Sequence, residues 1–126
     1  MREIKFRGKD LETKDFVFGS LITYEPCPII QCTELRENDY DYQSWEVDRE
    51  TVGQYTGLKD KNGVEIYEGD ILGMPEHKSE NWSGDVYFKE GAFFITPNGA
   101  ESLLNNYRAG RSIVIGNIHS NPELLK

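Results

Sequence analysis

The sequence predicts a mainly β protein in which short antiparallel strands form a small barrel or pseudo-barrel. Twelve glycines divide the 126 residues into short segments, and aromatic residues make up 12% of the chain. This composition is typical of many strands joined by turns. Residues 52–66 place Asn62-Gly63 between two β-prone runs, which is a strong hairpin signal because both residues tolerate positive φ. Small all-β chains close or stack their sheets, since this hides the strand edges.

The first two strands are predicted from alternation. In residues 2–7, Ile4 and Phe6 share one face and the charged residues share the other, as in a half-buried strand. Residues 15–24 resume as a strand with apolar residues on both faces, as in a central strand. Gly19 interrupts it, and the usual cause is a bulge or the close approach of another backbone segment. We expect the two strands to pair as an antiparallel hairpin.

Residues 26–50 are predicted to be a variable polar loop that contains a short strand at 29–33. Pro26 and Pro28 end the preceding strand, because proline cannot donate to a ladder. Residues 34–50 hold two arginines and seven carboxylates, a net charge of −5. One interpretation is a solvated loop that packs its rings on the barrel surface. The other is a recognition loop for a basic partner, because Tyr and Trp are favoured interface anchors. Its candidate residues are Tyr40, Tyr42, Trp45, Glu37, Asp39 and Asp41.

The second half of the chain continues with short strands. A turn at 68–70 leads into a strand that starts at Ile71, residues 74–84 form a second variable polar loop, and residues 85–96 form a hairpin. The strand order over 66–96 is compatible with an SH3-like barrel. We expect one short helix at 100–107, a strand at 111–118, and a tail that packs Leu124 and Leu125 on the body.

The length of the chain and its lack of targeting signals limit the class of protein that we expect. The chain is long enough for one domain, 1–126, with a modest core. No run approaches the ~20 apolar residues of a membrane span. The N-terminus, MREIKFRGKD, lacks the apolar segment of a signal peptide. We therefore expect a cytoplasmic protein that does not associate with membranes. Exposed strand edges also favour homo-oligomers in so small a protein.

No motif of an enzyme or a cofactor site stands out, and we expect neither. Cys27 and Cys32 are expected to be reduced thiols without a role in chemistry. Zinc would need two further ligands, and His77 and His119 lack suitable spacing to the cysteines. The same two histidines are the available general bases, and no serine occupies a nucleophile elbow.

The acidic residues between 60 and 70 match two kinds of site only superficially. A calcium loop that starts at Asp60 needs glycine at its sixth position, but glycine occupies the fourth. Glu65, Glu68 and Asp70 would have to crowd together to act as paired acid catalysts. Aspartate is common in turns because it accepts hydrogen bonds from nearby amides. We therefore favour a structural role for these carboxylates.

The net charge is −8, and four of the 14 basic residues lie close together near the N-terminus. Arg2, Lys5 and Arg7 alternate onto the predicted solvent face of the first strand, and Lys9 follows; we call these four residues the basic stripe. One interpretation is an ordinary charged outer face. The other is a small contact for phosphate or nucleic acid. The negative net charge opposes nucleic-acid binding, which depends on Lys and Arg displacing counterions.

Four segments resemble the YopX protein family of phages and prophages. They are REIKFRG at 2–8, DFVFGSLI at 15–22, TVGQYTGLKDKNGVEIYEGDIL at 51–72 and VIGNIHSNPELL at 114–125. The hairpin at 85–96 also fits the family pattern, whereas residues 26–45 and 74–83 match no pattern of the family. The resemblance implies a mostly-β fold and a phage or prophage origin in a bacterial cytoplasm. It implies no reaction and no catalytic residues.

The leading hypothesis is a non-enzymatic phage accessory protein that binds a host or phage protein through the acidic aromatic segment. A variant of this hypothesis is nucleic-acid mimicry, in which carboxylates spaced like phosphates occupy the DNA site of a host protein. The alternative is a weak nucleic-acid-binding β-barrel that uses the basic stripe.

Overall fold

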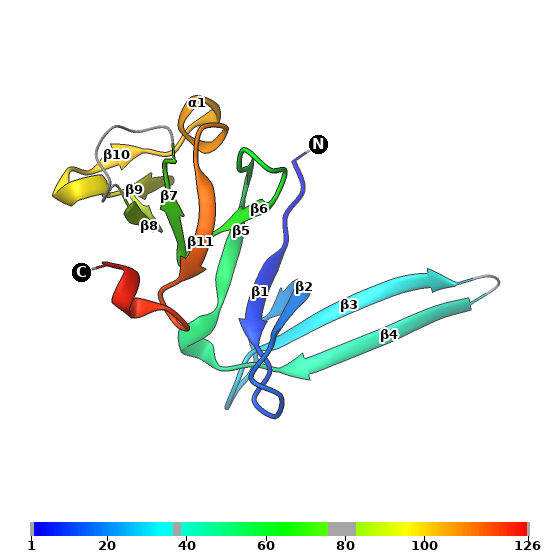
Figure 1. The fold of residues 1–126 in the computed structure, drawn as a ribbon. Coiled ribbons are helices and arrows are strands. Elements are labelled where there is room, and N and C mark those ends of the chain that lie inside the picture. Colours follow the sequence, from blue (N-terminus) through cyan, green and yellow to red (C-terminus); the bar gives the residue numbers. More distant parts are fainter. Residues whose placement is uncertain (1, 37–38, 76–82, 126) are drawn as a thin grey trace. The chain divides into compact units, whose positions relative to one another are not determined.

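The structure is a computed structural model that describes residues 2–36, 39–75 and 83–125. It confirms the mainly β prediction, because its sheets are built from antiparallel strand pairs (Figure 1). In the described part of the chain the sheets do not close into a complete barrel. The chain divides into two compact units, Met1–Gln54 and Tyr55–Lys126.

Unit 1 is a sheet in the order β4-β3-β2-β1, and the first residues of β5 lie on the other side of β1. Its strands are β1 (Phe6–Lys9), β2 (Phe16–Ile22), β3 (Ile29–Arg36) and β4 (Asp39–Glu46), followed by the 3-10 turn η1 (Arg49–Thr51) and β5 (Gly53–Lys59). The predicted hairpin of the first two strands is confirmed, with Phe6 opposite Gly19 and Lys9 opposite Phe16. The first strand starts at Phe6, so the prediction at residues 2–7 was placed too early.

Gly19 is required by the close approach of β3. A Cβ built on Gly19 would lie 2.3 Å from the carbonyl oxygen of Gln31, closer than atoms can approach. This confirms one of the two causes predicted for a glycine in this strand.

The prediction of a polar loop at 26–50 is wrong for most of that segment. Residues 29–46 form a hairpin, β3 and β4, with eight opposed pairs that run from Ile29 and Glu46 to Arg36 and Asp39. The β-branched and aromatic residues of both halves suit a strand, although the carboxylates between them suggested a solvated loop. The loop predicted at 74–84 lies largely outside the described residues, and β8 starts at Ser83.

Unit 2 holds a sheet in the order β10-β9-β8-β7-β11, together with the hairpin of β5 and β6. Its elements after β5 are β6 (Glu65–Tyr67), β7 (Asp70–Gly73), β8 (Ser83–Lys89), β9 (Ala92–Ile95), η2 (Pro97–Gly99), β10 (Ser102–Leu103), α1 (Asn106–Ala109), β11 (Ile113–Asn117) and η3 (Pro122–Leu125). Its core cluster consists of Ile66, Leu72, Val86, Ile95, Leu104 and Ala109.

The helix is shorter and later than predicted at 100–107. Ser102 pairs with Ile95 on the edge strand β10, which keeps this part of the chain extended. The helix starts only after Asn105, whose side chain accepts a hydrogen bond from the Arg108 amide at 2.9 Å. An asparagine at the N-cap satisfies an amide that has no partner within the helix. No helix in the described part of the chain is both long and apolar enough to span a membrane.

Candidate functional site

The distal part of the β3–β4 hairpin extends beyond the rest of unit 1. β2 pairs with β3 only from Ile22 to Ser20, which lies opposite Gln31. From there to Arg36, β3 has only β4 as a neighbouring strand in the described part of the chain, and the two continue side by side as a ribbon (Figure 1). We call residues 32–36 and 39–43 the arm. A two-stranded ribbon has no core of its own and is at best marginally stable in isolation.

The arm contains most of the residues predicted for partner binding. Tyr40, Asp41 and Tyr42 lie on β4, opposite Leu35, Glu34 and Thr33 in the ladder. Glu37 lies outside the described residues, as do the side chains of Asp39, Tyr40, Asp41 and Tyr42. Glu34 and Asp41 lie directly opposite each other in the ladder. Two acidic residues in directly opposite positions destabilise a sheet.

Trp45, the remaining predicted aromatic residue, lines a hollow at the base of the hairpin. The hollow has a volume of about 280 Å³ and is lined by Asp10, Leu11, Glu12, Ser44, Trp45 and Glu46. We call it the acidic hollow, because three of its lining residues are carboxylates and none is basic. The turn between β1 and β2 forms its other wall, since the Leu11 amide donates to the carbonyl oxygen of Glu46 at 3.0 Å.

The acidic hollow contains two residues that the sequence analysis missed, Asp10 and Glu12. Asp10 is 9% exposed, and its Oδ1 accepts a hydrogen bond from the Glu12 amide at 2.8 Å. Its Oδ2 receives no hydrogen bond from the described part of the chain. The spacing of Asp10 and Glu12 is typical of an Asx turn, but nothing local indicates that this turn meets the end of β4.

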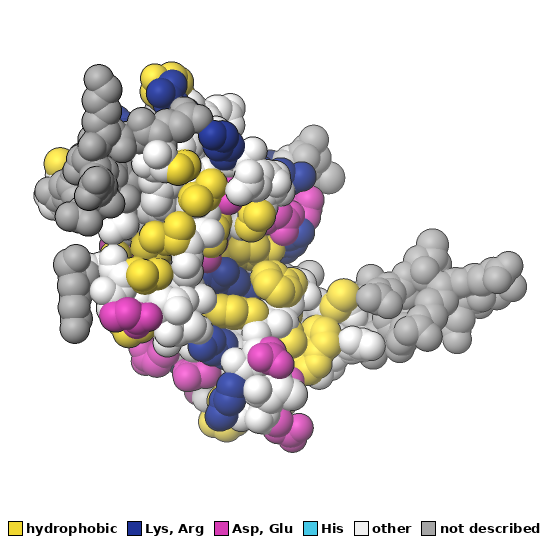
Figure 2. Space-filling model, in the orientation of Figure 1, with side chains coloured by type: hydrophobic (Ala, Val, Ile, Leu, Met, Phe, Trp, Pro, Cys, Tyr) yellow, Lys and Arg dark blue, Asp and Glu magenta, His cyan; other side chains and the backbone are white. Residues whose placement is uncertain are grey.

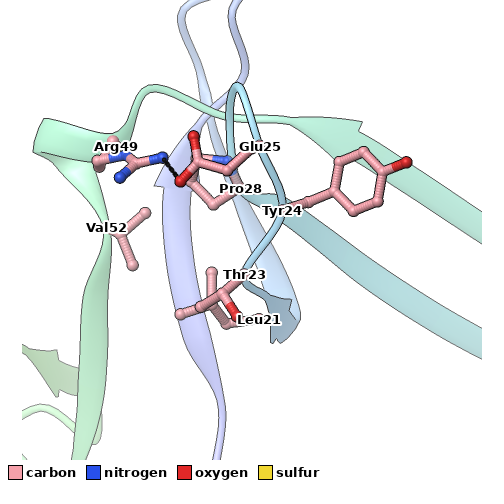
Figure 3. A pocket seen from close by; sticks show the side chains of 7 residues that line it. All are labelled: Leu21, Thr23, Tyr24, Glu25, Pro28, Arg49 and Val52. Carbon is pink, nitrogen blue, oxygen red and sulfur yellow. Dashed lines mark hydrogen bonds and ion pairs between the residues drawn. The ribbon is translucent and has the colours of Figure 1, made fainter.

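A second hollow of about 260 Å³ lies elsewhere in unit 1 and is mainly apolar (Figure 3). Its lining residues are Leu21, Thr23, Tyr24, Glu25, Pro28, Arg49 and Val52. The Arg49 guanidinium donates to Glu25 at 3.2 Å and to the carbonyl oxygen of Pro26 at 3.4 Å. Tyr24 points away from this ion pair (Figure 3). Glu25 and Pro26 therefore hold one nitrogen of the Arg49 guanidinium beside this hollow.

Arg7 of the basic stripe does not lie on the predicted solvent face, whereas Arg2 is exposed and Lys5 and Lys9 are half-buried. Arg7 is only 7% exposed, and its guanidinium carbon lies 4.3 Å from the centre of the Phe16 ring. Lys9 also lies over Phe16, at 5.5 Å, while Ile4, predicted to face the core, is 58% exposed. The prediction failed for Arg7 because Phe16 of the neighbouring strand β2, two residues from the cross-strand partner Phe18, covers its guanidinium.

Apolar side chains also reach the surface away from the arm. In the space-filling view they lie among charged side chains on the face that is drawn (Figure 2). Tyr107 is 70% exposed and Tyr24 is 61% exposed. Single exposed apolar residues are normal in soluble proteins, so they do not define a site.

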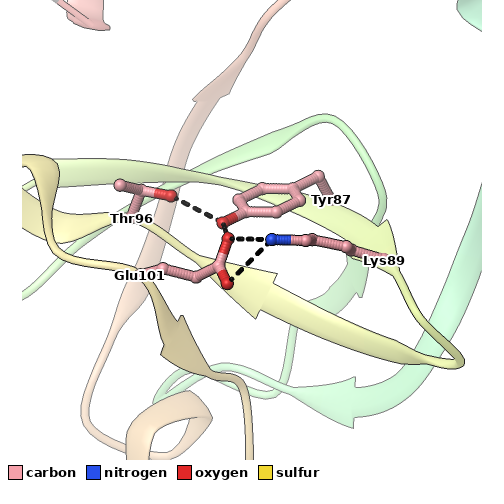
Figure 4. Close-up of polar contacts among 4 residues, drawn as sticks. All are labelled: Tyr87, Lys89, Thr96 and Glu101. Carbon is pink, nitrogen blue, oxygen red and sulfur yellow. Dashed lines mark hydrogen bonds and ion pairs between the residues drawn. The ribbon is translucent and has the colours of Figure 1, made fainter.

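In unit 2, polar side chains form a small network on β8 and the segment before β10 (Figure 4). The Tyr87 hydroxyl donates to Glu101 and accepts from Thr96 at 3.0 Å, and Lys89 pairs with Glu101 at 3.3 Å. The hydrogen bond to Glu101 raises the pKa of Tyr87, and the same bond lowers the pKa of Glu101. Both pKa shifts favour a protonated Tyr87 phenol beside an ionised Glu101 carboxylate. Neither group is therefore poised to exchange a proton near neutral pH.

The remaining candidates for chemistry are dispersed. His77 lies outside the described residues, and His119 follows β11. Partial burial, followed by the nearby Glu46 carboxylate, raises the pKa of Cys27, which disfavours a reactive thiolate. Among the described residues no group of three or more His, Cys, Asp or Glu side chains is arranged to hold a metal ion.

One comparison with known proteins identifies a family. The family model described as YopX protein matches residues 5–126. The crystal structure of protein EF1440 from Enterococcus faecalis is similar to the chain with a TM-score of 0.69 and 27% sequence identity, over 100% of both chains. The comparison with curated proteins found no match.

Proposed function

The chain belongs to the YopX family, and we propose that it is a non-enzymatic phage or prophage accessory protein that acts in a bacterial cytoplasm. Its activity is to bind another protein through the arm. The observation that supports this proposal is the arm itself, a ribbon that continues past Gln31 with no further strand beside it in the described part of unit 1. Such an extension adds little to the core, and it presents two strands to a partner.

The composition of the arm supports a protein partner with a basic surface. Its described residues, CTELR and DYDYQ, include three carboxylates, two tyrosines and one arginine. Aromatic residues supply contact area at low entropic cost, and complementary charge accelerates association. The charge also opposes a nucleic-acid partner at this surface.

Affinity capture tests this proposal. Tagged protein is incubated with nuclease-treated bacterial lysate, and retained proteins are identified by mass spectrometry. We expect a retained partner that is lost with the Tyr40→Ala/Tyr42→Ala variant. The matched control is Tyr24→Ala/Tyr107→Ala, which removes two aromatic residues that are 61% and 70% exposed outside the arm. Equal retention by both double variants would show that the arm does not bind the partner.

Nucleic-acid mimicry is a special case of the same proposal. Competition with duplex DNA distinguishes mimicry from binding at another surface of the partner. If the arm occupies the DNA site of a host protein, added duplex DNA displaces that protein from the tagged chain. If the partner uses another surface, duplex DNA has no effect.

The alternative, nucleic-acid binding through the basic stripe, loses support from the burial of Arg7 against Phe16. It predicts retention of the protein on single-stranded DNA or RNA, with affinity that falls as salt rises. Absence of retention at low salt would eliminate it.

A further inference from the structure

The outer edge of β4 has the features of a binding site for an extended chain. Four strands lie at the edges of the two sheets. β4 has eight residues, β11 has five, β6 has three and β10 has two. In the described part of the chain, β3 is the only strand that pairs with β4. A long edge presents a row of backbone donors and acceptors, and natural proteins usually shorten such edges or block them with Lys or Pro. β4 contains neither residue.

Contacts at the base of the hairpin show which backbone groups of β4 face outward. The carbonyl oxygen of Glu46 accepts from the Leu11 amide, whereas the amide of Val47 donates to Pro28, at the start of β3. In an antiparallel strand the N–H and C=O of one residue point to the same side, and the side alternates along the chain. The backbone groups of Ser44 therefore face away from β3, as do those of every second residue before it.

The acidic hollow lies at the C-terminal end of this edge. Asp10 and Glu12 approach from the turn between β1 and β2, and Ser44, Trp45 and Glu46 belong to β4. Lys14 contributes a cation to the same turn, where its Nζ donates to the carbonyl oxygen of Leu11 at 2.7 Å, but it does not line the hollow. Carboxylates beside an indole ring suit a Lys or Arg side chain, which gains both ion pairing and cation–π attraction.

We infer that the outer edge of β4 binds an extended basic segment of a partner protein by strand addition, with a Lys or Arg of that segment in the acidic hollow. This inference rests on the proposed function and adds the mode of binding and the chemistry of the partner. In strand addition, main-chain hydrogen bonds supply affinity and side-chain pockets supply specificity. Both parts are present here, as outward backbone groups at Ser44 and a carboxylate-lined hollow beside it.

A second copy of the chain suits this edge less well than a basic segment. Two β4 strands side by side would bring together three carboxylates from each copy, with no Lys or Arg of β4 to pair with them. Like charges directly opposite each other destabilise a sheet. The Glu46 carbonyl oxygen is also already occupied by Leu11.

The test uses the full chain and a capped peptide as long as β4 in which lysine alternates with threonine. Binding is measured by fluorescence anisotropy. Strand addition is probed by Ser44→Pro, which removes one outward N–H without removing a bond to β3, because edge strands accept proline where the N–H faces outward. Ser44→Ala is the matched control. A second peptide, which carries N-methyl groups on alternate residues, probes strand addition from the side of the peptide.

We expect Ser44→Pro to weaken peptide binding about fivefold relative to Ser44→Ala, the effect of losing about one hydrogen bond. Glu12→Gln/Glu46→Gln should weaken the peptide about tenfold and reduce its salt dependence. The control for charge is Glu90→Gln/Glu123→Gln, which removes two exposed carboxylates of unit 2.

The outcomes separate this inference from the proposed function. If peptide binding is insensitive to Ser44→Pro and to N-methylation, strand addition is wrong, whereas arm-dependent capture of a protein still supports the proposed function. If the Glu12→Gln/Glu46→Gln variant binds as tightly as the wild type, the acidic hollow does not take the cation. If the peptide does not bind and capture is independent of the arm, both proposals are wrong. Loss of binding in Ser44→Pro counts for strand addition only when its circular dichroism spectrum and melting temperature match those of Ser44→Ala.

Discussion

The Oδ2 atom of Asp60 accepts a hydrogen bond from the Val114 amide at 2.9 Å, across 54 residues of sequence. The Oδ1 atom of the same carboxylate accepts from the amides of Asn62 and Val64 at 2.8 and 2.9 Å, so it also shapes the Asn62-Gly63 turn. Asp60 is 6% exposed. One buried carboxylate therefore joins the β5–β6 hairpin to β11 within unit 2, and the residue considered as a calcium ligand has a structural role.

Replacing Asp60 should strongly destabilise the protein. Asp60→Ala leaves three backbone amides without their acceptor, and we expect a loss of ~3 kcal/mol or more in the free energy of unfolding. Asp60→Asn keeps one acceptor but places a donor toward Val114, so an intermediate loss of ~1–3 kcal/mol is expected. Urea denaturation measures both variants, with the exposed Glu123→Ala as the control. Equal stability of Asp60→Ala and Glu123→Ala would contradict this role.

Gly19 should tolerate no side chain. Its Cβ would meet the Gln31 carbonyl oxygen at 2.3 Å, and the neighbouring atoms are backbone, which cannot rotate away. We expect Gly19→Ala to cost ~2 kcal/mol or more, as overpacking does, and to disturb the pairing of β2 with β3. The control is Gly57→Ala, also at positive φ but with no atom within 4 Å of the added Cβ. A smaller loss for Gly19→Ala than for Gly57→Ala would refute the close-approach argument.

Removing the arm should leave the fold intact. Cys32 lies opposite Gln43, so a two-residue Asn-Gly turn can replace residues 33–42 and close the remaining hairpin. Because the deleted ribbon pairs only with itself, we expect the free energy of unfolding to change by no more than about 1 kcal/mol. Denaturation and the circular dichroism spectrum measure this change. A large loss of stability would show that the arm contributes to the fold of unit 1.

The Tyr87–Glu101 pair should give stability a weak dependence on pH at both extremes. The folded state lowers the pKa of Glu101, so its contribution is present above the unfolded pKa and is lost as pH falls through the folded value. The folded state raises the pKa of Tyr87, so that contribution is lost as pH rises through its folded value. Solvent screens the exposed pair, so the effects are small.

Melting temperatures of wild type and Tyr87→Phe across the pH range measure this dependence. The difference between the two should be largest near neutral pH and should shrink in acid and in strong alkali. Tyr107→Phe, at an exposed tyrosine, is the control and should follow the wild type. A difference between wild type and Tyr87→Phe that is constant with pH would contradict the linkage.

Local signals in the sequence correctly predicted the hairpins at 52–66 and 85–96, although not the β3–β4 hairpin. Asn62-Gly63 and Glu90-Gly91 mark turns whose residues adopt positive φ at Gly63, Glu90 and Gly91, and this preference depends on little beyond the turn itself. The helix was placed too early because Leu103 and Leu104 suit a helix face, whereas pairing with β9 extends the chain there. Tertiary pairing outweighed helix propensity, as it commonly does in short segments.

The sequence by itself determined the class of the fold, the family and the acidic aromatic character of the arm. The tertiary structure alone decided which residues are buried and which meet. Arg7 is covered because Phe16 of the neighbouring strand β2, nine residues later in the sequence, lies against its guanidinium. The acidic hollow exists because the turn at Asp10 contacts Glu46, 36 residues later. Such contacts depend on the order of strands in the sheet, which alternation and turn residues do not encode.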